Sequence, residues 1–162
     1  MDLWLLLLLQ LAALVYALLG GIFLAFSDFL LRSINQAPAG VAVMQAINRD
    51  VFRSLFLALF FVMIPASLVL GLFGLLAVSG GAALCLLIAG LVYVIGVFAV
   101  TGFGNVPLNK ALAALPDGSE EAQAYWQATY RRRWAAWNHL RTAACFLSAG
   151  LVSLAVVLLG TP

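Results

Sequence analysis

The sequence predicts an all-α membrane protein: one bundle of four transmembrane helices, the last of which extends into the cytoplasm. Of the 162 residues, 65% are hydrophobic and only 9% are charged, whereas a soluble domain normally carries about 25% charged residues. Four apolar runs each approach the roughly 20 residues that cross a hydrocarbon core of about 30 Å. The length suits a single domain, 1–162. With a net charge of +2, nothing favours nucleic-acid binding.

The apolar runs predict spans at about 3–31, 54–78, 82–103 and 142–159. The first run has neither the basic start nor the small-residue cleavage site of a signal peptide, so we interpret it as a span. Pro65 should kink the second span, which neighbouring helices can accommodate. A short turn at 79–81 leads into the third span. We expect Pro107, in "GFGNVPLN" (102–109), to end that span.

The two longer connections carry helix signals of their own. The stretch "VAVMQAINRDVF" (41–52) interleaves apolar and polar residues and predicts a short amphipathic helix. The sequence Pro116-Asp117-Gly118 indicates a turn. Ser119 can then cap a helix. Since no breaker follows before Ala149, we expect that helix to continue as the fourth span.

All eight Lys and Arg residues lie in or beside two connections, 32–53 and 104–141. With four spans, these connections share one side of the membrane, which the positive-inside rule makes cytoplasmic. The sequence therefore predicts a multi-pass protein of the inner (plasma) membrane with both termini outside.

The two cysteines, Cys85 and Cys145, form no CxxC pair or metal-ligand spacing. We expect them at depths roughly 20 Å apart. A disulfide needs Cα atoms within about 7 Å, so both should be free thiols. A lone histidine, His139, also argues against a haem or metal centre within one chain. The sequence thus predicts neither a metal nor a cofactor.

Polar residues near the cytoplasmic end are the candidate functional groups, because burying them in a membrane is costly unless they are paired. Asp28 precedes Arg32 by four residues, which permits an ion pair on one helix face. Alternatively, Asp28 is a buried carboxylate with a raised pKa that acts as a base. Asn105 and Asn109 flank Pro107; they either satisfy freed backbone groups or present donors to a ligand.

The last helix carries an aromatic stripe. At about 100° per residue, six side chains share an arc of roughly 100° and Asn138 falls beside it, while His139 points to the far side. Such a stripe is either a membrane-interface anchor or one wall of a site, with Arg141 needing a partner such as Asp28, Asn105 or Asn109. The six are Trp126, Tyr130, Trp134, Trp137, Arg141 and Cys145.

Three stretches resemble the anthrone oxygenase-like family of small integral membrane proteins: "FSDFLLRSINQAPAGVAVMQAINRDVF" (26–52), "NVPLNKALAAL" (105–115) and "YWQATYRRRWAAWNHLRTAA" (125–144). The resemblance implies a four-helix membrane protein. It also implies a link to anthrone oxidation, since some fungal members assist the conversion of anthrones to anthraquinones. The matching positions are Gln45, Asn48, Asn105, Pro107, Asn109, Trp134, Asn138, His139 and Arg141.

The resemblance suggests a cofactor-independent oxygenase acting on a hydrophobic aromatic substrate. Removing the ring-methylene proton of an anthrone gives an electron-rich carbanion that O₂ can attack. The base would be His139 or Asp28. Donors for the enolate oxygen would be Asn109, Asn138 and Arg141, and the aromatic wall would be Trp134 and Trp137. Gln45, Asn48 and Asn105 are the remaining expected substrate-binding residues.

A second function stays open: a non-enzymatic partner subunit or a carrier of lipophilic molecules. Its polar residues would join helices, and its arginines would bind anionic lipids. Membrane lipids are expected partners in either case. A pocket for a tricyclic ligand at the polar cluster would favour the enzyme. A homo-oligomer is also compatible with the small-residue faces at Gly20–Gly21, Gly71 with Gly74, and Gly90 with Gly96.

Overall fold

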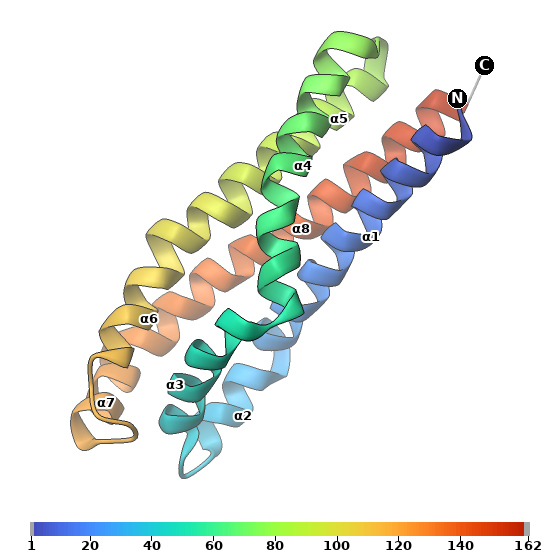
Figure 1. The fold of residues 1–162 in the computed structure, drawn as a ribbon. Coiled ribbons are helices and arrows are strands. Elements are labelled where there is room, and N and C mark those ends of the chain that lie inside the picture. The colour runs from blue at the N-terminus through green and yellow to red at the C-terminus, as the bar shows by residue number, and fades with distance from the viewer. Residues whose placement is uncertain (1, 161–162) are drawn as a thin grey trace.

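The computed structural model describes residues 2–160 as four long helices and one short one (Figure 1). The first long helix, Leu3–Gln36, consists of α1 (Leu3–Ala25), a π-helical turn (Phe26–Leu30) and α2 (Leu31–Gln36). The short helix α3 (Gly40–Asp50) and a 3₁₀ turn (Val51–Arg53) lead into α4 (Leu55–Ala77).

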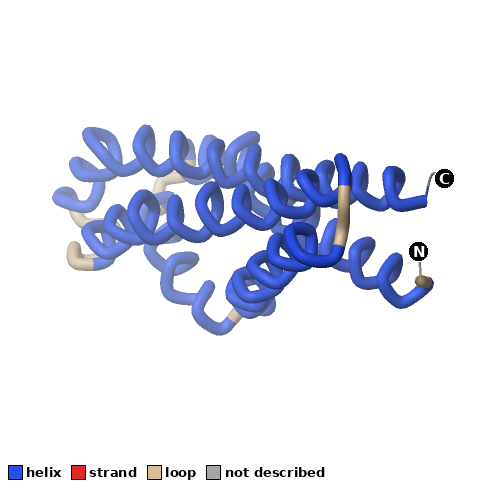
Figure 2. The backbone as a smooth tube through the Cα atoms, turned by 90° about the horizontal axis from the view of Figure 1, so that it is seen from above, coloured by secondary structure: helices blue, strands red, loops and turns tan. Residues whose placement is uncertain are grey.

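The third long helix, Gly80–Ala113, contains α5 (Gly80–Tyr93), π turns at Val94–Ala99 and Thr101–Asn105, and α6 (Val106–Ala113). The fourth, Glu120–Gly160, contains α7 (Glu120–Tyr125), a π turn (Trp126–Tyr130) and α8 (Arg131–Gly160). The tube in Figure 2 shows no strand between residues 2 and 160.

The fold class predicted from the sequence is confirmed: the chain is all-α and has four helices long and apolar enough to cross a membrane. It is thus a multi-pass membrane protein. Three of these helices run past the predicted span limits, to Gln36, to Ala113 and back to Glu120. The prediction that Pro107 ends the third helix is wrong. Pro107 is the second residue of α6, and the π turn at 101–105, just before α6, already departs from the i→i+4 ladder that proline would break.

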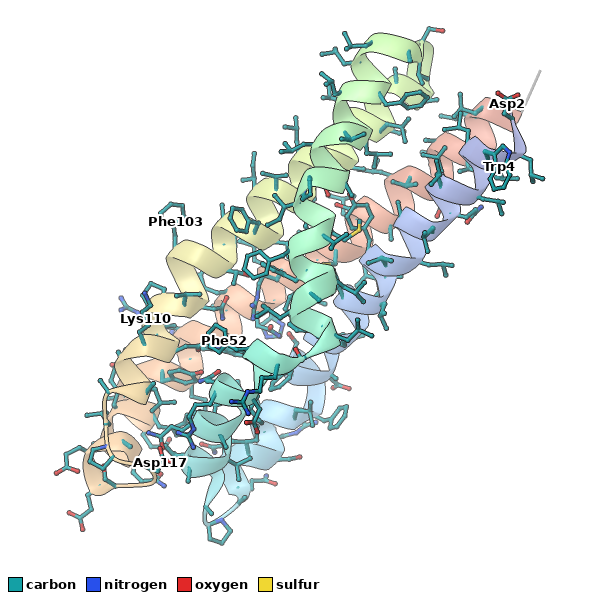
Figure 3. The ribbon with its side chains drawn as sticks, viewed as in Figure 1. Asp2, Trp4, Phe52, Phe103, Lys110 and Asp117 are labelled. Atoms are coloured by element: carbon teal, nitrogen blue, oxygen red, sulfur yellow. The ribbon has the colours of Figure 1, made fainter. Side chains whose placement is uncertain are left out.

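Both termini and the turn between α4 and α5 lie at one end of the molecule, while α2, α3, α6 and α7 lie at the other (Figure 1). We call the latter the basic end, because it carries the chain's Lys and Arg residues except Arg141. Figure 3 shows Lys110 and Asp117 there and Asp2 and Trp4 at the opposite end. Between the two ends, α8 packs against α1 and α5, and α4 packs mainly against α5.

The buried apolar residues form two cores. The first core lies between the four spanning helices and includes Tyr16, Leu19, Leu86, Val97 and Val152. Outside it the helices expose many leucines, as expected where lipid is the solvent. The second core belongs to the basic end. Its members are Leu31, Ile34, Val41, Met44, Leu108, Leu112, Ala122, Trp126, Tyr130 and Trp134.

Small residues permit close helix contacts inside the chain. A Cβ on Gly90 would overlap the carbonyl oxygen of Ser67, and one on Gly96 would lie 2.7 Å from Ala144. Gly74 similarly faces Ala83 and Leu86, at 2.8 Å. The faces at Gly74, Gly90 and Gly96 are therefore occupied within one chain, whereas Gly21 has no neighbour within 4 Å of a Cβ; the expected homo-oligomer stays a prediction.

Several local sequence signals are confirmed. The Ser119 side chain accepts a hydrogen bond from the Ala122 amide at 3.2 Å and caps α7. From there the helix is continuous to Gly160. The amphipathic segment forms α3. Pro65 lies inside α4, and the expected kink there stays a prediction. Cys85 and Cys145 are both buried and free, as predicted.

Candidate functional site

Residues 2–160 contain four π turns: one in the first long helix, two in the third and one in the fourth. The second long helix, α4, has none. A π turn inserts an extra residue into a helix and is frequent at functional sites. The turn at 26–30 carries Ser27, and the turn at 101–105 carries Thr101 and Asn105. These side chains meet α8 around one residue, Arg141.

Arg141 is buried, with only 6% of its surface exposed. Its Nη2 donates to Asn138 Oδ1 at 2.7 Å, and its Nη1 donates to Thr101 Oγ1 at 3.3 Å. Its guanidinium carbon lies 4.3 Å from the centre of the Phe23 ring and 5.3 Å from that of Trp134. The first and third long helices thus supply partners to a cation on the fourth, and the aromatic ring faces attract that cation further. We call this cluster the Arg141 site. Its members are Phe23, Ser27, Thr101, Asn105, Trp134, Asn138, Arg141 and Thr142.

Among the described residues, 2–160, the positive charge of Arg141 has no carboxylate partner. Between residues 2 and 160 the one ion pair joins Arg49 and Asp117, at the basic end. The Nε of Arg141 and the Oδ1 of Asn105 are buried without a hydrogen-bond partner. Burying an uncompensated charge costs several kcal/mol. The site therefore has the character of a receptor for a negatively charged oxygen.

Asn138 connects α8 to the first helix. Its Nδ2 donates to the Phe23 carbonyl and to Ser27 Oγ, both at 2.7 Å. The Thr142 hydroxyl donates to the Asn138 carbonyl at 2.9 Å. With Nδ2 committed to the first helix and Oδ1 to Arg141, Asn138 holds the guanidinium in place.

Asn105 and Asn109 fix α6 against the last helix. Asn105 Nδ2 donates to the Trp134 carbonyl at 3.2 Å. Asn109 Oδ1 accepts from Tyr130 OH at 2.8 Å and from Trp134 Nε1 at 2.9 Å. Asn48 Nδ2 donates to Tyr130 OH at 3.2 Å. Asn48 and Asn109 therefore position the aromatic rings and do not touch Arg141 itself.

The aromatic stripe forms a buried ladder. The rings of Trp126 and Tyr130 stack with centroids 5.2 Å apart, and those of Tyr130 and Trp134 with centroids 6.3 Å apart. All three are buried in the second core. The interpretation of the stripe as an interface anchor is wrong for these three residues, because α2, α3 and α6 cover the face that they share.

Six of the ten predicted site residues lie outside the cluster: Asn48 and Asn109, described above, and His139, Trp137, Gln45 and Asp28. His139 is exposed on the opposite face of α8, as its helical phase indicated. Trp137 is 41% exposed and lies against Gly104, where a Cβ would come within 2.6 Å of its ring. Gln45 is fully buried at the basic end. It donates to the Leu112 and Leu115 carbonyls and accepts from the Gly118 amide, each at 3.0 Å.

Asp28 is exposed, and no ion pair joins it to Arg32. Neither sequence interpretation of Asp28 holds, since it is neither paired with Arg32 nor buried. The π turn that begins at Phe26 changes the phase of the helix and turns this carboxylate outward. Asp28 lines an open groove of about 340 Å³ between the first helix and the start of α8. The other lining residues are Ser27, Leu31, Arg32, Arg131, Arg132 and Ala135.

A second, apolar groove of about 120 Å³ lies between α4 and α5, lined by Ser67, Gly71, Gly90 and neighbouring leucines. Arg141 lines neither groove. No three His, Cys, Asp or Glu side chains within residues 2–160 come together as a metal site.

Sequence reasoning missed four members of the Arg141 site: Phe23, Ser27, Thr101 and Thr142. The four-residue spacing of Thr101 and Asn105 placed both polar groups on one face of an apolar helix, and this signal was available. Ser27 stands beside Asp28, and the sequence analysis selected the charged residue of the two. No sequence signal distinguished Phe23 from the other apolar residues of the first span.

The sequence model of the anthrone oxygenase family matches residues 49–151, well over half of the chain. The chain belongs to the anthrone oxygenase family. The matched region contains six members of the Arg141 site: Thr101, Asn105, Trp134, Asn138, Arg141 and Thr142. Phe23 and Ser27, which complete the site in this anthrone oxygenase family member, lie before it. Comparison with curated proteins and with solved structures gave no match.

Proposed function

We propose that this chain oxidises a flat, phenolic, hydrophobic substrate with O₂ at the Arg141 site. The observation that carries the proposal is the buried Arg141 guanidinium, which has no carboxylate partner between residues 2 and 160 and leaves Nε unpaired. An enolate or phenolate oxygen would supply the missing negative charge. In a site of low dielectric, such compensation is worth far more than in water.

The reaction follows from stabilising that oxyanion. Loss of a ring-methylene proton places negative charge on the carbonyl oxygen of an anthrone and electron density on the ring carbon. O₂ forms a bond to that carbon, the peroxide anion takes back the proton from the base, and the hydroperoxide then loses water to give the second carbonyl of the quinone. One oxygen atom enters the product, the other leaves as water, and the substrate supplies both electron pairs. Arg141 acts by holding the oxyanion in place.

Asp28 is the better of the two candidate bases. It follows Ser27, whose hydroxyl accepts a hydrogen bond from Asn138 at 2.7 Å, so it lies one residue from the Arg141 site. His139 lies on the exposed opposite face of α8. His139 therefore takes no part in proton removal, and Asp28 can remove the proton only if its exposed carboxylate turns toward the Arg141 site.

Aromatic residues would hold the flat substrate. Phe23 and Trp134 are buried against the Arg141 guanidinium, so a planar ligand would meet their rings only after a side chain moved. Because Arg141 lines neither groove, a substrate must move a side chain to reach it. Trp137 is partly exposed and lies beside Gly104, the residue before Asn105. Entry past Trp137 would bring a lipophilic substrate directly from the bilayer.

The test is quinone formation from emodin anthrone under air by the purified protein. Arg141→Ala should lower the enzymatic rate about 10²–10³-fold, the usual cost of losing an oxyanion donor. Arg133→Ala, which removes an exposed arginine from the same helix, is the matched control and should retain the wild-type rate. Equal rates for wild type, Arg141→Ala and a protein-free blank would refute the proposal.

The second candidate is a non-enzymatic carrier of lipophilic molecules. It is favoured by the absence of Arg141 from the lining of either groove. Quenching of tryptophan fluorescence by emodin anthrone under argon measures binding alone. Binding that depends on Trp134 without any turnover under air would favour the carrier over the oxygenase.

We propose further that the basic end faces the cytoplasm of a plasma membrane, which the positive-inside rule supports. In a Cys85→Ala, Cys145→Ala background, an impermeant thiol reagent added to intact cells should label Ser79→Cys and leave Asp117→Cys unlabelled. The reverse labelling pattern would invert the topology.

A further inference from the structure

We propose that the groove between α2 and the start of α8 binds the phosphate group of an anionic phospholipid. Three of its seven lining residues are arginines: Arg32 from the first helix, and Arg131 and Arg132 from the last. Asp28 is the one acidic residue in that lining. Three guanidinium groups against one carboxylate leave an excess of two positive charges in a space of about 340 Å³.

The depth of the groove suits a lipid headgroup. A span of about 30 Å needs about 20 residues at 1.5 Å each. Counted from Leu3, allowing for some tilt, the hydrocarbon ends near Phe26. Counted back from Gly160 along α8, it ends near Trp137. Arg32 and Arg132 then lie beyond this boundary by roughly 10 Å, within the headgroup layer that adds several ångströms to each side of the core.

The register of the two helices places arginines from both at one level of the groove. The two helices are antiparallel: Ser27 meets Asn138, and Asn35 accepts a hydrogen bond from Trp126 Nε1 at 2.9 Å. Arg32 therefore lies at the level of Arg131. Asp28 lies one turn closer to the membrane centre, at the inner end, where it does not compete for the phosphate.

The three arginines are free to bind a phosphate. None is in an ion pair, since the one pair among residues 2–160 joins Arg49 to Asp117. A guanidinium offers a planar fork of donors that matches two phosphate oxygens. Donors from two helices would clamp a single group from both sides, which isolated surface arginines cannot do.

The occupant is a membrane lipid because an apolar surface continues from the groove toward the bilayer. Leu24 lies one helical turn above Asp28 on the same face and is 45% exposed, and the neighbouring Phe29 is 48% exposed. Acyl chains can lie on these side chains while the phosphate stays between the arginines. This inference does not depend on the proposed oxygenase chemistry.

The experiment measures lipid retained by the full chain. The protein is purified from detergent containing equimolar phosphatidylglycerol and phosphatidylcholine, and bound lipid is counted by native mass spectrometry. Wild type should retain phosphatidylglycerol preferentially. The groove variant, Arg32→Gln with Arg131→Gln and Arg132→Gln, should retain at least about tenfold less, since each arginine near an anionic lipid contributes about fivefold to binding.

A matched control removes three positive charges from the same end but outside the groove: Arg53→Gln with Lys110→Gln and Arg133→Gln. It should retain phosphatidylglycerol within twofold of wild type, about the uncertainty of such a comparison. Equal loss in the groove and control variants would overturn the proposal, because it would show attraction to net charge alone. A wild type that prefers neither lipid would also overturn it.

A third arm separates a lipid from a free anion. Millimolar inorganic phosphate in lipid-free detergent should leave the thermal midpoint unchanged, whereas phosphatidylglycerol should raise it. An equal rise with phosphate, abolished in the groove variant, would reassign the site to a soluble anion. Because Arg133→Gln is part of the control, misfolding from charge removal at this end would appear there as well.

Discussion

The side-chain oxygen of Asn138 accepts a hydrogen bond of 2.7 Å from Arg141, one turn further along α8. The amide nitrogen of the same Asn138 binds the first helix through the Phe23 carbonyl and Ser27. A neutral amide thus positions the guanidinium. A carboxylate at the same position would neutralise its charge. This choice leaves the charge of Arg141 available to a ligand.

Arg141→Met should leave the unfolding free energy unchanged or raise it by about 1–3 kcal/mol. Replacing a buried, incompletely paired charge with an apolar side chain of similar length removes a desolvation cost. Thermal unfolding in detergent, followed by circular dichroism, measures the change. A loss of more than about 3 kcal/mol would mean that the contacts to Asn138, Thr101 and the two rings outweigh that cost.

Gly90→Ala should destabilise the contact between α4 and α5 by about 1–3 kcal/mol, because its Cβ would overlap the Ser67 carbonyl. Gly150→Ala is the control, since nothing lies within 4 Å of a Cβ there. That substitution should stabilise α8 by up to about 1 kcal/mol. Unfolding in mixed micelles compares the two variants. Similar effects from both would show that α4 can shift away from α5 without cost.

The four spanning helices could be predicted from the sequence because a span needs only length and hydrophobicity, and both are local properties. The helix ends could not be predicted with the same accuracy. Apolar character stops near Leu31 and Phe103, whereas the backbone stays helical to Gln36 and Ala113. Packing in the second core maintains these extensions, and that core depends on contacts between distant segments.

The Arg141 site shows a second limit of sequence reasoning. A regular helix projects Trp137 into the same arc as Trp134 and leaves Asn138 beside it. One extra residue in the π turn at 126–130 rotates everything after it by up to about 100°. That rotation moves Asn138 to the buried centre and Trp137 to the edge. A π turn has no reliable sequence signature, so the aromatic stripe was recognised but its phase was not.

Gln45→Glu should destabilise the basic end by about 3 kcal/mol or more. Gln45 donates to the carbonyls of Leu112 and Leu115, and a carboxylate cannot donate to either. Gln36→Glu, at an exposed position, should change stability by less than about 0.5 kcal/mol. Hydrogen exchange of the α6 amides reports the local effect. Unchanged protection in Gln45→Glu would show that the turn after α6 is held by other contacts.

The Arg49–Asp117 pair should make a small, pH-dependent contribution to stability. Two hydrogen bonds of 2.9 and 2.8 Å join the exposed side chains, and the guanidinium holds the pKa of Asp117 below its ordinary value. A lowered carboxyl pKa stabilises the fold above the unfolded-state pKa, and this contribution is lost as pH falls through the lowered, folded-state value. Added salt should weaken it.

Carbon-detected NMR titration of Asp117 in wild type and Arg49→Gln measures this shift directly. The substitution should move the Asp117 pKa upward, toward its ordinary value. In the charge-reversed double variant, Arg49→Asp with Asp117→Arg, the carboxyl group introduced in α3 should again show a lowered pKa. Identical Asp117 titration in wild type and Arg49→Gln would mean that the pair does not form in solution.

The two cores fold against different solvents. Burial of the first core transfers side chains from lipid to protein, with no gain from expelling water, so its stability rests on tight contacts such as that of Gly90 with Ser67. The second core, beyond the hydrocarbon, is stabilised by the hydrophobic effect as in a small soluble domain. The protein therefore has two parts, connected by α8, that are stabilised by different forces. Urea should unfold the basic end first, while the helices in the membrane stay folded. The heat-capacity change of that first unfolding step should be positive.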